Sequence, residues 1–150
     1  MYLSSVTIQE RRIETDAKCI DKIIDSSDSS TLDRQALIDA IKKAKKTAST
    51  GKEELEKLHV PESTKKIHEL YKQIFALNIQ QIDIAGQILS SADSAKNAEM
   101  LKQLADIKKQ IETLSQEILD EKRALSASYQ EVQLPEASPA AAQPNTHQSN

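Results

Sequence analysis

The sequence predicts an all-α protein: an antiparallel up-down-up-down four-helix bundle with coiled-coil-like packing and a disordered C-terminal tail. Leucine, isoleucine and alanine recur at steps of three, four and seven residues over most of the chain, which is the spacing of one face of a helix. Between Leu3 and Val132 a single proline, Pro61, interrupts this pattern, and the chain has only two glycines. A fold with many strands would need more turn residues than this.

Three breaks divide the apolar pattern into four segments. Serine and aspartate, which cap helices and favour turns, make up residues 26–30 and four of the five residues at 90–94. The third break is His59-Val60-Pro61, where proline disfavours helical geometry at the residue before it. We therefore expect helices at about residues 3–25, 32–58, 61–90 and 94–132. Short connections make each helix antiparallel to the one before it.

The second and third helices have distinct apolar patterns. The second follows a heptad through Leu37, Ile41, Ala44, Ala48, Gly51, Leu55 and Leu58. Gly51 at a core position indicates a close crossing by another helix. The third helix has a second apolar row beside its main stripe, and so wide a face predicts neighbours on two sides.

Residues 133–150 contain three prolines and almost no apolar side chain larger than alanine. Such a segment cannot bury enough surface to order itself, so we expect a disordered tail.

The sequence disfavours an enzyme, and we expect no cofactor and no metal. Cys19 is the single cysteine, and we interpret it as a small apolar residue at a helix edge. A dimetal centre in a bundle needs two Glu-x-x-His pairs, and only Glu56 and His59 match. The net charge of −3, with acids and bases interleaved, and only four aromatic residues argue against nucleic-acid binding.

Lys42, Lys43, Lys45 and Lys46 form the densest charged patch. It is a candidate contact for an anionic partner, such as a lipid headgroup or an acidic protein. The simpler interpretation is a solvated helix face balanced by neighbouring glutamates, so membrane-surface contact is the less favoured alternative. The chain has no apolar run long enough to predict a transmembrane segment.

Two interpretations of function follow. The leading one is a structural or protein-interaction bundle, which binds a partner or self-associates through the end of the fourth helix, because that helix outruns the first. Its contact residues would be Leu125, Tyr129, Val132 and Leu134. The alternative is a ligand-sensing bundle with a small-molecule site among Tyr71, Phe75, Asn78 and Gln81. Buried amides at such positions more often fix the register of helices.

The junction between the second and third helices carries a resemblance. Leu55, Leu58 and Pro61 form a Leu-x-x-Leu-x-x-Pro turn, and His68 follows near the start of a long helix. This resembles a hairpin of uncharacterised helical-bundle proteins of the bacterial cell envelope, in layout from about residue 32 to 125. The resemblance implies a secreted or lipid-anchored bundle of unknown role. The start of the sequence has no signal peptide or anchoring cysteine, which predicts a cytoplasmic protein, or an extracytoplasmic one if a leader has been removed. We expect His68 to have a structural role near the hairpin.

Overall fold

The computed structural model describes Arg11, Lys18, Asp21 and residues 34–133, except for the side chains of Arg34 and of residues 130–133. Three long helices run through this part of the chain: α2 (Arg34–Glu56), α3 (Lys65–Ser90) and α4 (Ser94–Gln133). A short 3-10 helix, η1 (Glu62–Thr64), precedes α3. The described residues contain no strand, so the predicted all-α class is confirmed for them.

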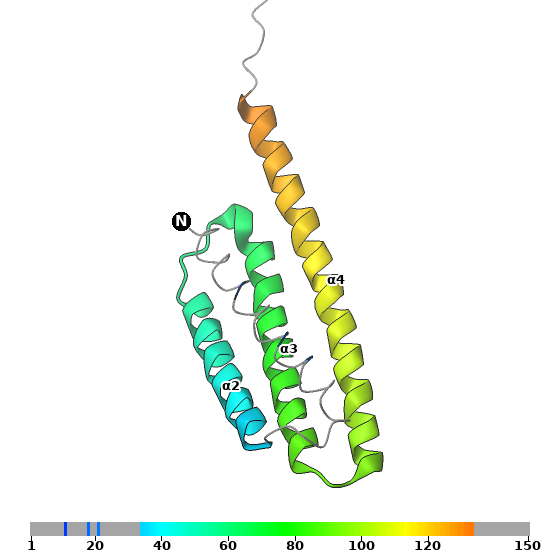
Figure 1. The fold of residues 1–150 in the computed structure, drawn as a ribbon. Coiled ribbons are helices and arrows are strands. Elements are labelled where there is room, and N and C mark those ends of the chain that lie inside the picture. Colours follow the sequence, from blue (N-terminus) through cyan, green and yellow to red (C-terminus); the bar gives the residue numbers. More distant parts are fainter. Residues whose placement is uncertain (1–10, 12–17, 19–20, 22–33, 134–150) are drawn as a thin grey trace, which may run out of the picture.

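The first predicted helix, residues 3–25, and the break after it lie outside the described residues, apart from three positions. Arg11, Lys18 and Asp21 are each helical. The predicted tail also lies outside the described residues, except for Gln133, which ends α4. The four-helix bundle therefore stays a prediction, and the described structure is three helices side by side in the order α2, α3, α4 (Figure 1).

Helix α2 buries the stripe that its heptad predicts. Ala44, Ala48 and Leu55 are at most 6% exposed, and Gly51 is also buried. Small side chains at three of these four positions allow α2 to lie close to α3. Ala44 and Ala48 pack against Ile82 of α3.

The connection between α2 and α3 is longer than the sequence predicts. Helix α2 ends at Glu56 and α3 begins at Lys65, whereas the pattern placed a helix start at Pro61. The cause is the backbone of Pro61, which is extended (φ −58°, ψ 147°) and precedes η1. The carbonyl of Pro61 accepts hydrogen bonds from the backbone N–H and the hydroxyl of Thr64, both at 3.0 Å. Pro61 thus caps a turn of 3-10 helix before the α-helix starts.

Helix α3 is the central element and contacts both neighbours, as its wide apolar face predicts. At about 100° per residue, its buried side chains cover roughly 200° of its circumference. Ile82 lies on the side of α2, and Ile84 lies on the side of α4, where it packs with Met100, Leu104 and Ile107. Asn78 and Ala85 lie between these two directions and are each 1% exposed. We call this part of α3 the middle face.

The turn between α3 and α4 occupies the predicted break at residues 90–94. Asp93 caps α4, because its Oδ1 accepts hydrogen bonds from the backbone N–H groups of Ala95 (3.0 Å) and Lys96 (3.1 Å). Two of the N–H groups left without a partner at the start of α4 are satisfied in this way.

Helix α4 is longer than the helix it packs against. It has 40 residues and α3 has 26, a difference of 14 residues or about 21 Å at 1.5 Å per residue. Its buried residues are Met100, Leu104, Ile107 and Ile118. The excess lies at its C-terminal end, which extends past the α2–α3 hairpin (Figure 1).

Gly86 offers a test of the packing between α2 and α3. A Cβ added at Gly86 would lie 3.5 Å from Ile41 Cγ2, an ordinary van der Waals distance. Since alanine favours helix over glycine, Gly86→Ala should raise the free energy of unfolding by about 0.5–1 kcal/mol. Urea unfolding measures this, and Ala85→Gly at the neighbouring buried position should have the opposite sign. A lower unfolding midpoint for Gly86→Ala would contradict the packing described.

Candidate functional site

The predicted partner-contact residues lie at the C-terminal end of α4 or beyond it. Leu125 is partly buried and packs against the cluster formed by Leu55, Tyr71 and their neighbours. Tyr129 is 59% exposed, the most exposed large hydrophobic residue in the described structure. Val132 belongs to α4, but its side chain, like the whole of Leu134, lies outside the described residues.

Sequence periodicity missed two further exposed apolar residues on α4. Leu101 is 37% exposed and Leu119 is 48% exposed. Both lie off the heptad that faces α3, and they are 18 residues apart, which is five turns and places them on one side of the helix. With Tyr129, they are the three large hydrophobic residues that the described part of the chain exposes, and all three belong to α4.

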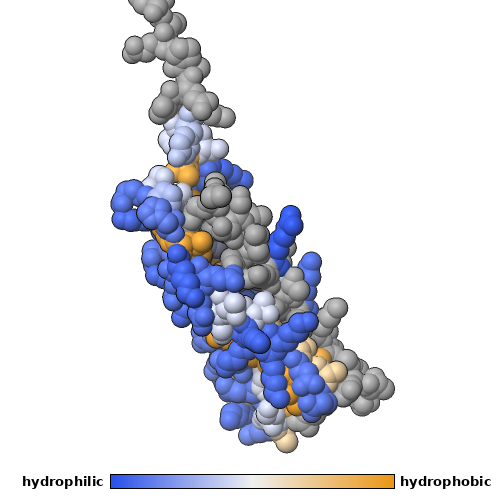
Figure 2. Space-filling view, turned by 90° about the vertical axis from the view of Figure 1, so that its left-hand side faces the viewer, coloured by the Kyte–Doolittle hydropathy of each residue, from blue (hydrophilic) through white to orange (hydrophobic). Residues whose placement is uncertain are grey.

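The four lysines of the predicted anionic contact are exposed on α2. Figure 2, which views the molecule from the side on which α2 lies in Figure 1, shows mainly hydrophilic residues. Lys45 Nζ lies 2.5 Å from Asp83 Oδ1 of α3. One lysine of the patch is therefore engaged within the chain, and Lys42, Lys43 and Lys46 remain at the surface.

The four residues of the predicted ligand pocket are all buried on α3: Tyr71, Phe75, Asn78 and Gln81 are at most 7% exposed. Lys122 of α4 lies over the ring of Tyr71, 5.5 Å from its centroid. Asn78 is different, because both polar atoms of its amide are buried without a hydrogen-bond partner among the described residues. An unpaired buried amide costs stability, so we expect a polar group to contact the middle face of α3.

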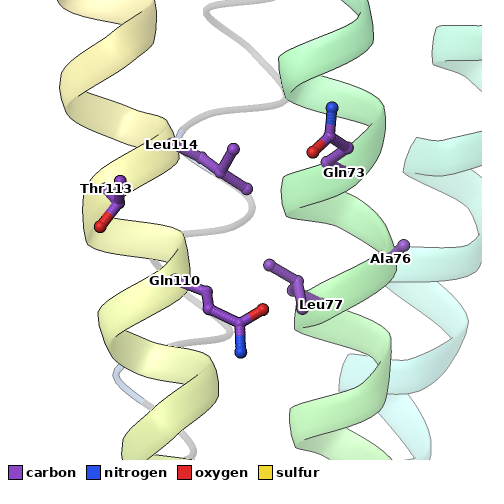
Figure 3. Close-up of a pocket in the computed structure, with 6 residues that line it drawn as sticks. All are labelled: Gln73, Ala76, Leu77, Gln110, Thr113 and Leu114. Carbon is purple, nitrogen blue, oxygen red and sulfur yellow. The ribbon is translucent and has the colours of Figure 1, made fainter.

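A cavity of about 420 Å³ lies elsewhere, between α3 and α4. Its lining comes from α3 (Gln73, Ala76, Leu77) and from α4 (Gln110, Thr113, Leu114). Figure 3 shows Leu77, Gln110 and Leu114 projecting between the two helices. None of the four predicted pocket residues lines this cavity. The sequence gives little signal for it, since a groove depends on helix spacing and rotamers as well as on the heptad.

Glu121, the one charged residue within the heptad of α4, has a partner. It accepts a short hydrogen bond from Lys66 Nζ of α3, which makes an ion pair across the two helices. The hydrogen bond and the charge of Glu121 raise the pKa of Lys66, and the charge of Glu117 adds to this. Charge therefore joins α3 and α4 at this position.

His68 is 7% exposed near the start of α3. Burial lowers its pKa from the ordinary value of 6.5; the charge of Glu69 opposes this shift and the charge of Lys72 adds to it. His59 of the predicted hairpin is exposed, as is Glu56. Within the described ranges, no three His, Cys, Asp or Glu residues are grouped as a metal site, and no helix is long and apolar enough to cross a bilayer.

The lowered pKa of His68 predicts that acid destabilises the protein. Above about pH 6.5 the imidazole of His68 is neutral in both the folded and the unfolded chain, so its titration does not reduce the free energy of unfolding. As the pH falls below this value, the unfolded chain binds the proton first, so the free energy of unfolding decreases.

We expect His68→Gln to reduce the loss of stability between about pH 7.5 and about pH 5.5, measured by urea unfolding. His59→Gln, at the exposed histidine, is the matched control and should leave that loss unchanged. Equal pH dependence in His68→Gln and the unaltered chain would show that the burial of His68 does not control it.

The chain matches no protein-family model, no curated protein and no solved structure, and its function is therefore argued from its own residues.

Proposed function

We propose that this protein is a non-enzymatic helical bundle that acts as a structural or interaction module, and that α4 is the helix that contacts a protein partner. The observation that carries the proposal is the distribution of exposed apolar side chains. Leu101, Leu119 and Tyr129 all lie on α4. Leu119 and Tyr129 lie in the C-terminal half of α4, with Tyr129 in the part that extends past α3, and Leu101 lies near its start. Apolar residues exposed on one element are typical of a contact surface.

The proposal includes a fourth helix, residues 3–25, packed on the middle face of α3. Two observations support it. The middle face is buried although it points to neither α2 nor α4, as Asn78 and Ala85 show. Asp21, which is helical, forms an ion pair with α4, its Oδ1 lying 3.3 Å from Lys108 Nζ.

The Asp21–Lys108 ion pair also sets a register. In an antiparallel pair of helices with equal rise, moving 18 residues from Asp21 toward the N-terminus reaches Leu3, and moving 18 residues along α4 from Lys108 reaches Ser126. In this register the N-terminus of the first helix lies beside Leu125, which is partly buried. It stops short of Tyr129, so the surface left for a partner is the last two turns of α4 together with Leu119.

A short cross-linker tests the fourth helix. We expect Asp21→Cys with Lys108→Cys, in a Cys19→Ser background, to give an intramolecular product with a bismaleimide, identified by mass spectrometry. The reason is that these two side chains meet in an ion pair. Asp21→Cys with Lys42→Cys, on the exposed outer side of α2, is the control and should not cross-link. Equal yields in both pairs would count against the packed first helix.

Truncation after Arg123 tests the interaction surface. Because it removes Tyr129 and the end of α4, we expect the truncated chain to lose partners that the full chain recovers from a native lysate, or to lose mass in light scattering if the partner is a second copy. Light scattering distinguishes a second copy of the chain from a different protein partner. The same partners and the same oligomeric state in both chains would defeat the proposal and leave the end of α4 as a frayed helix.

Since truncation also removes Leu125 from the core cluster, a point variant provides the control for folding. Leu119→Ser with Tyr129→Ser changes two exposed side chains and should alter stability by no more than about 0.5 kcal/mol. It should still reduce recovery of the partner.

A further inference from the structure

The cavity between α3 and α4 lies on the side of α3 opposite to its middle face. Gln73 and Ala76, which line it, are exposed and lie well over a quarter turn away from Asn78 around the helix. Leu77 and Leu114 project between the two helices together with the amide of Gln110, and Gln73 and Ala76 border the cavity on α3 (Figure 3). No charged side chain lines it.

The wall of α4 beside this cavity continues in both directions as an acidic stripe. Asp106 lies one turn before Gln110, and Glu117 lies one turn after Thr113, so both share the side of α4 that lines the cavity. The full stripe runs at steps of four and three residues through Glu99, Gln103, Asp106, Gln110, Thr113 and Glu117, all of them exposed. It contains three carboxylates and no lysine or arginine.

The opposite wall belongs to α3, and the described lysines of α3 that lie on or beside it, Lys65, Lys66 and Lys72, are each paired with a carboxylate. Its exposed residues on this side are Glu69, Gln73, Gln80 and Gln87. Glu69 pairs with Lys72 of its own helix. Lys66 is the cation of α3 at the Pro61 end of this side, and it is paired with Glu121.

The three carboxylates of the stripe are available to a partner. Glu99, Asp106 and Glu117 form no ion pair with any residue in the described ranges, although the charge of Glu117 reaches Lys66. Three lysines of α4 flank the stripe. Lys96 lies one turn before Glu99, Lys102 lies between Glu99 and Asp106 at steps of three and four residues, and Lys109 lies one turn after Asp106, but none of them forms an ion pair with a stripe carboxylate in the described structure. The groove thus has a lining that is uncharged and partly apolar, and an acidic border on α4.

We propose that this groove binds a basic amphipathic helix of a protein partner, with its apolar side chains on Ala76, Leu77 and Leu114 and its lysines or arginines toward Asp106 and Glu117. Charge complementarity selects the occupant. The length fits too: Glu99 and Glu117 are 18 residues apart, or about 27 Å, which matches a helix of about 18 residues. A helix laid along a groove between two helices follows the ordinary packing of bundles.

A second copy of this chain fits the groove less well. The lysine-rich outer side of α2 has the right charge but presents lysines together with Asp39 and Glu53, and its apolar residues face α3. The proposal rests on the protein being an interaction module, but it uses a different side of α4 from Tyr129.

Two synthetic peptides of about 18 residues test the proposal. Both carry leucine and alanine at one helical stripe; one has lysine and the other glutamate at the flanking positions. Fluorescence anisotropy with the full chain should show binding of the lysine peptide, weakened by salt, and none of the glutamate peptide.

Charge reversal on the chain completes the test. Asp106→Lys with Glu117→Lys should weaken binding of the lysine peptide at least about tenfold. Glu53→Lys with Glu112→Lys makes the same change in net charge on exposed residues outside the stripe, and should change the affinity less than about twofold. Circular dichroism and urea unfolding confirm that both variants fold.

NMR shift changes on addition of the lysine peptide should centre on Ala76, Gln110 and Thr113. The proposal is overturned if the two peptides bind equally, if the lysine peptide does not bind, if the shift changes centre on α2, or if both charge reversals have the same effect. Self-association of the full chain that Asp106→Lys with Glu117→Lys abolishes, detected by light scattering, also overturns it. Truncation after Arg123 leaves the groove in place, so peptide binding by the truncated chain separates this proposal from the one for the end of α4.

Discussion

The structure depends on the wide buried face of α3. About 200° of its circumference is covered, and no single neighbouring helix can cover so much. Ile82 packs toward α2 and Ile84 toward α4, with the middle face between them. The arrangement in which α3 lies between its two neighbours follows from this constraint, as does the proposal that residues 3–25 complete the bundle. The opposite side of α3 is polar, and the groove with its acidic border lies there.

Much of this arrangement could be predicted from the sequence, because helices leave a strong periodic signal. The positions of α2, α3 and α4, the wide face of α3 and the break at residues 90–94 all follow from apolar spacing and capping residues. The start of α3 could not be predicted, because proline is compatible both with the first turn of an α-helix and with the extended backbone that Pro61 adopts before η1. Which serine or aspartate at residues 90–94 caps α4 likewise depends on backbone geometry, and Asp93 does so.

The candidate sites were harder to predict than the fold. Leu101 and Leu119 do not fit the heptad, and their exposure is known only once the partners of α4 are placed. The buried amide of Asn78 was correctly placed on the apolar face, but its hydrogen bonding depends on what covers the middle face. The acidic stripe is spread over 19 residues and mixed with lysines in the sequence. It becomes one surface only when α4 is helical and its groove side is known.

The ion pair between Lys66 and Glu121 has a consequence for the alignment of α3 and α4. A heptad seam is nearly repetitive, so two helices can slide by seven residues and still bring leucine and isoleucine together. A slip of one heptad along α4 would carry Glu121 to the place of Leu114 or of Ser128 and leave Lys66 without its partner. Such a slip loses the ion pair and, in the first direction, places a carboxylate at a partly buried position beside the apolar core cluster. One charged pair in an otherwise repetitive seam thus distinguishes the observed alignment from its closest competitors.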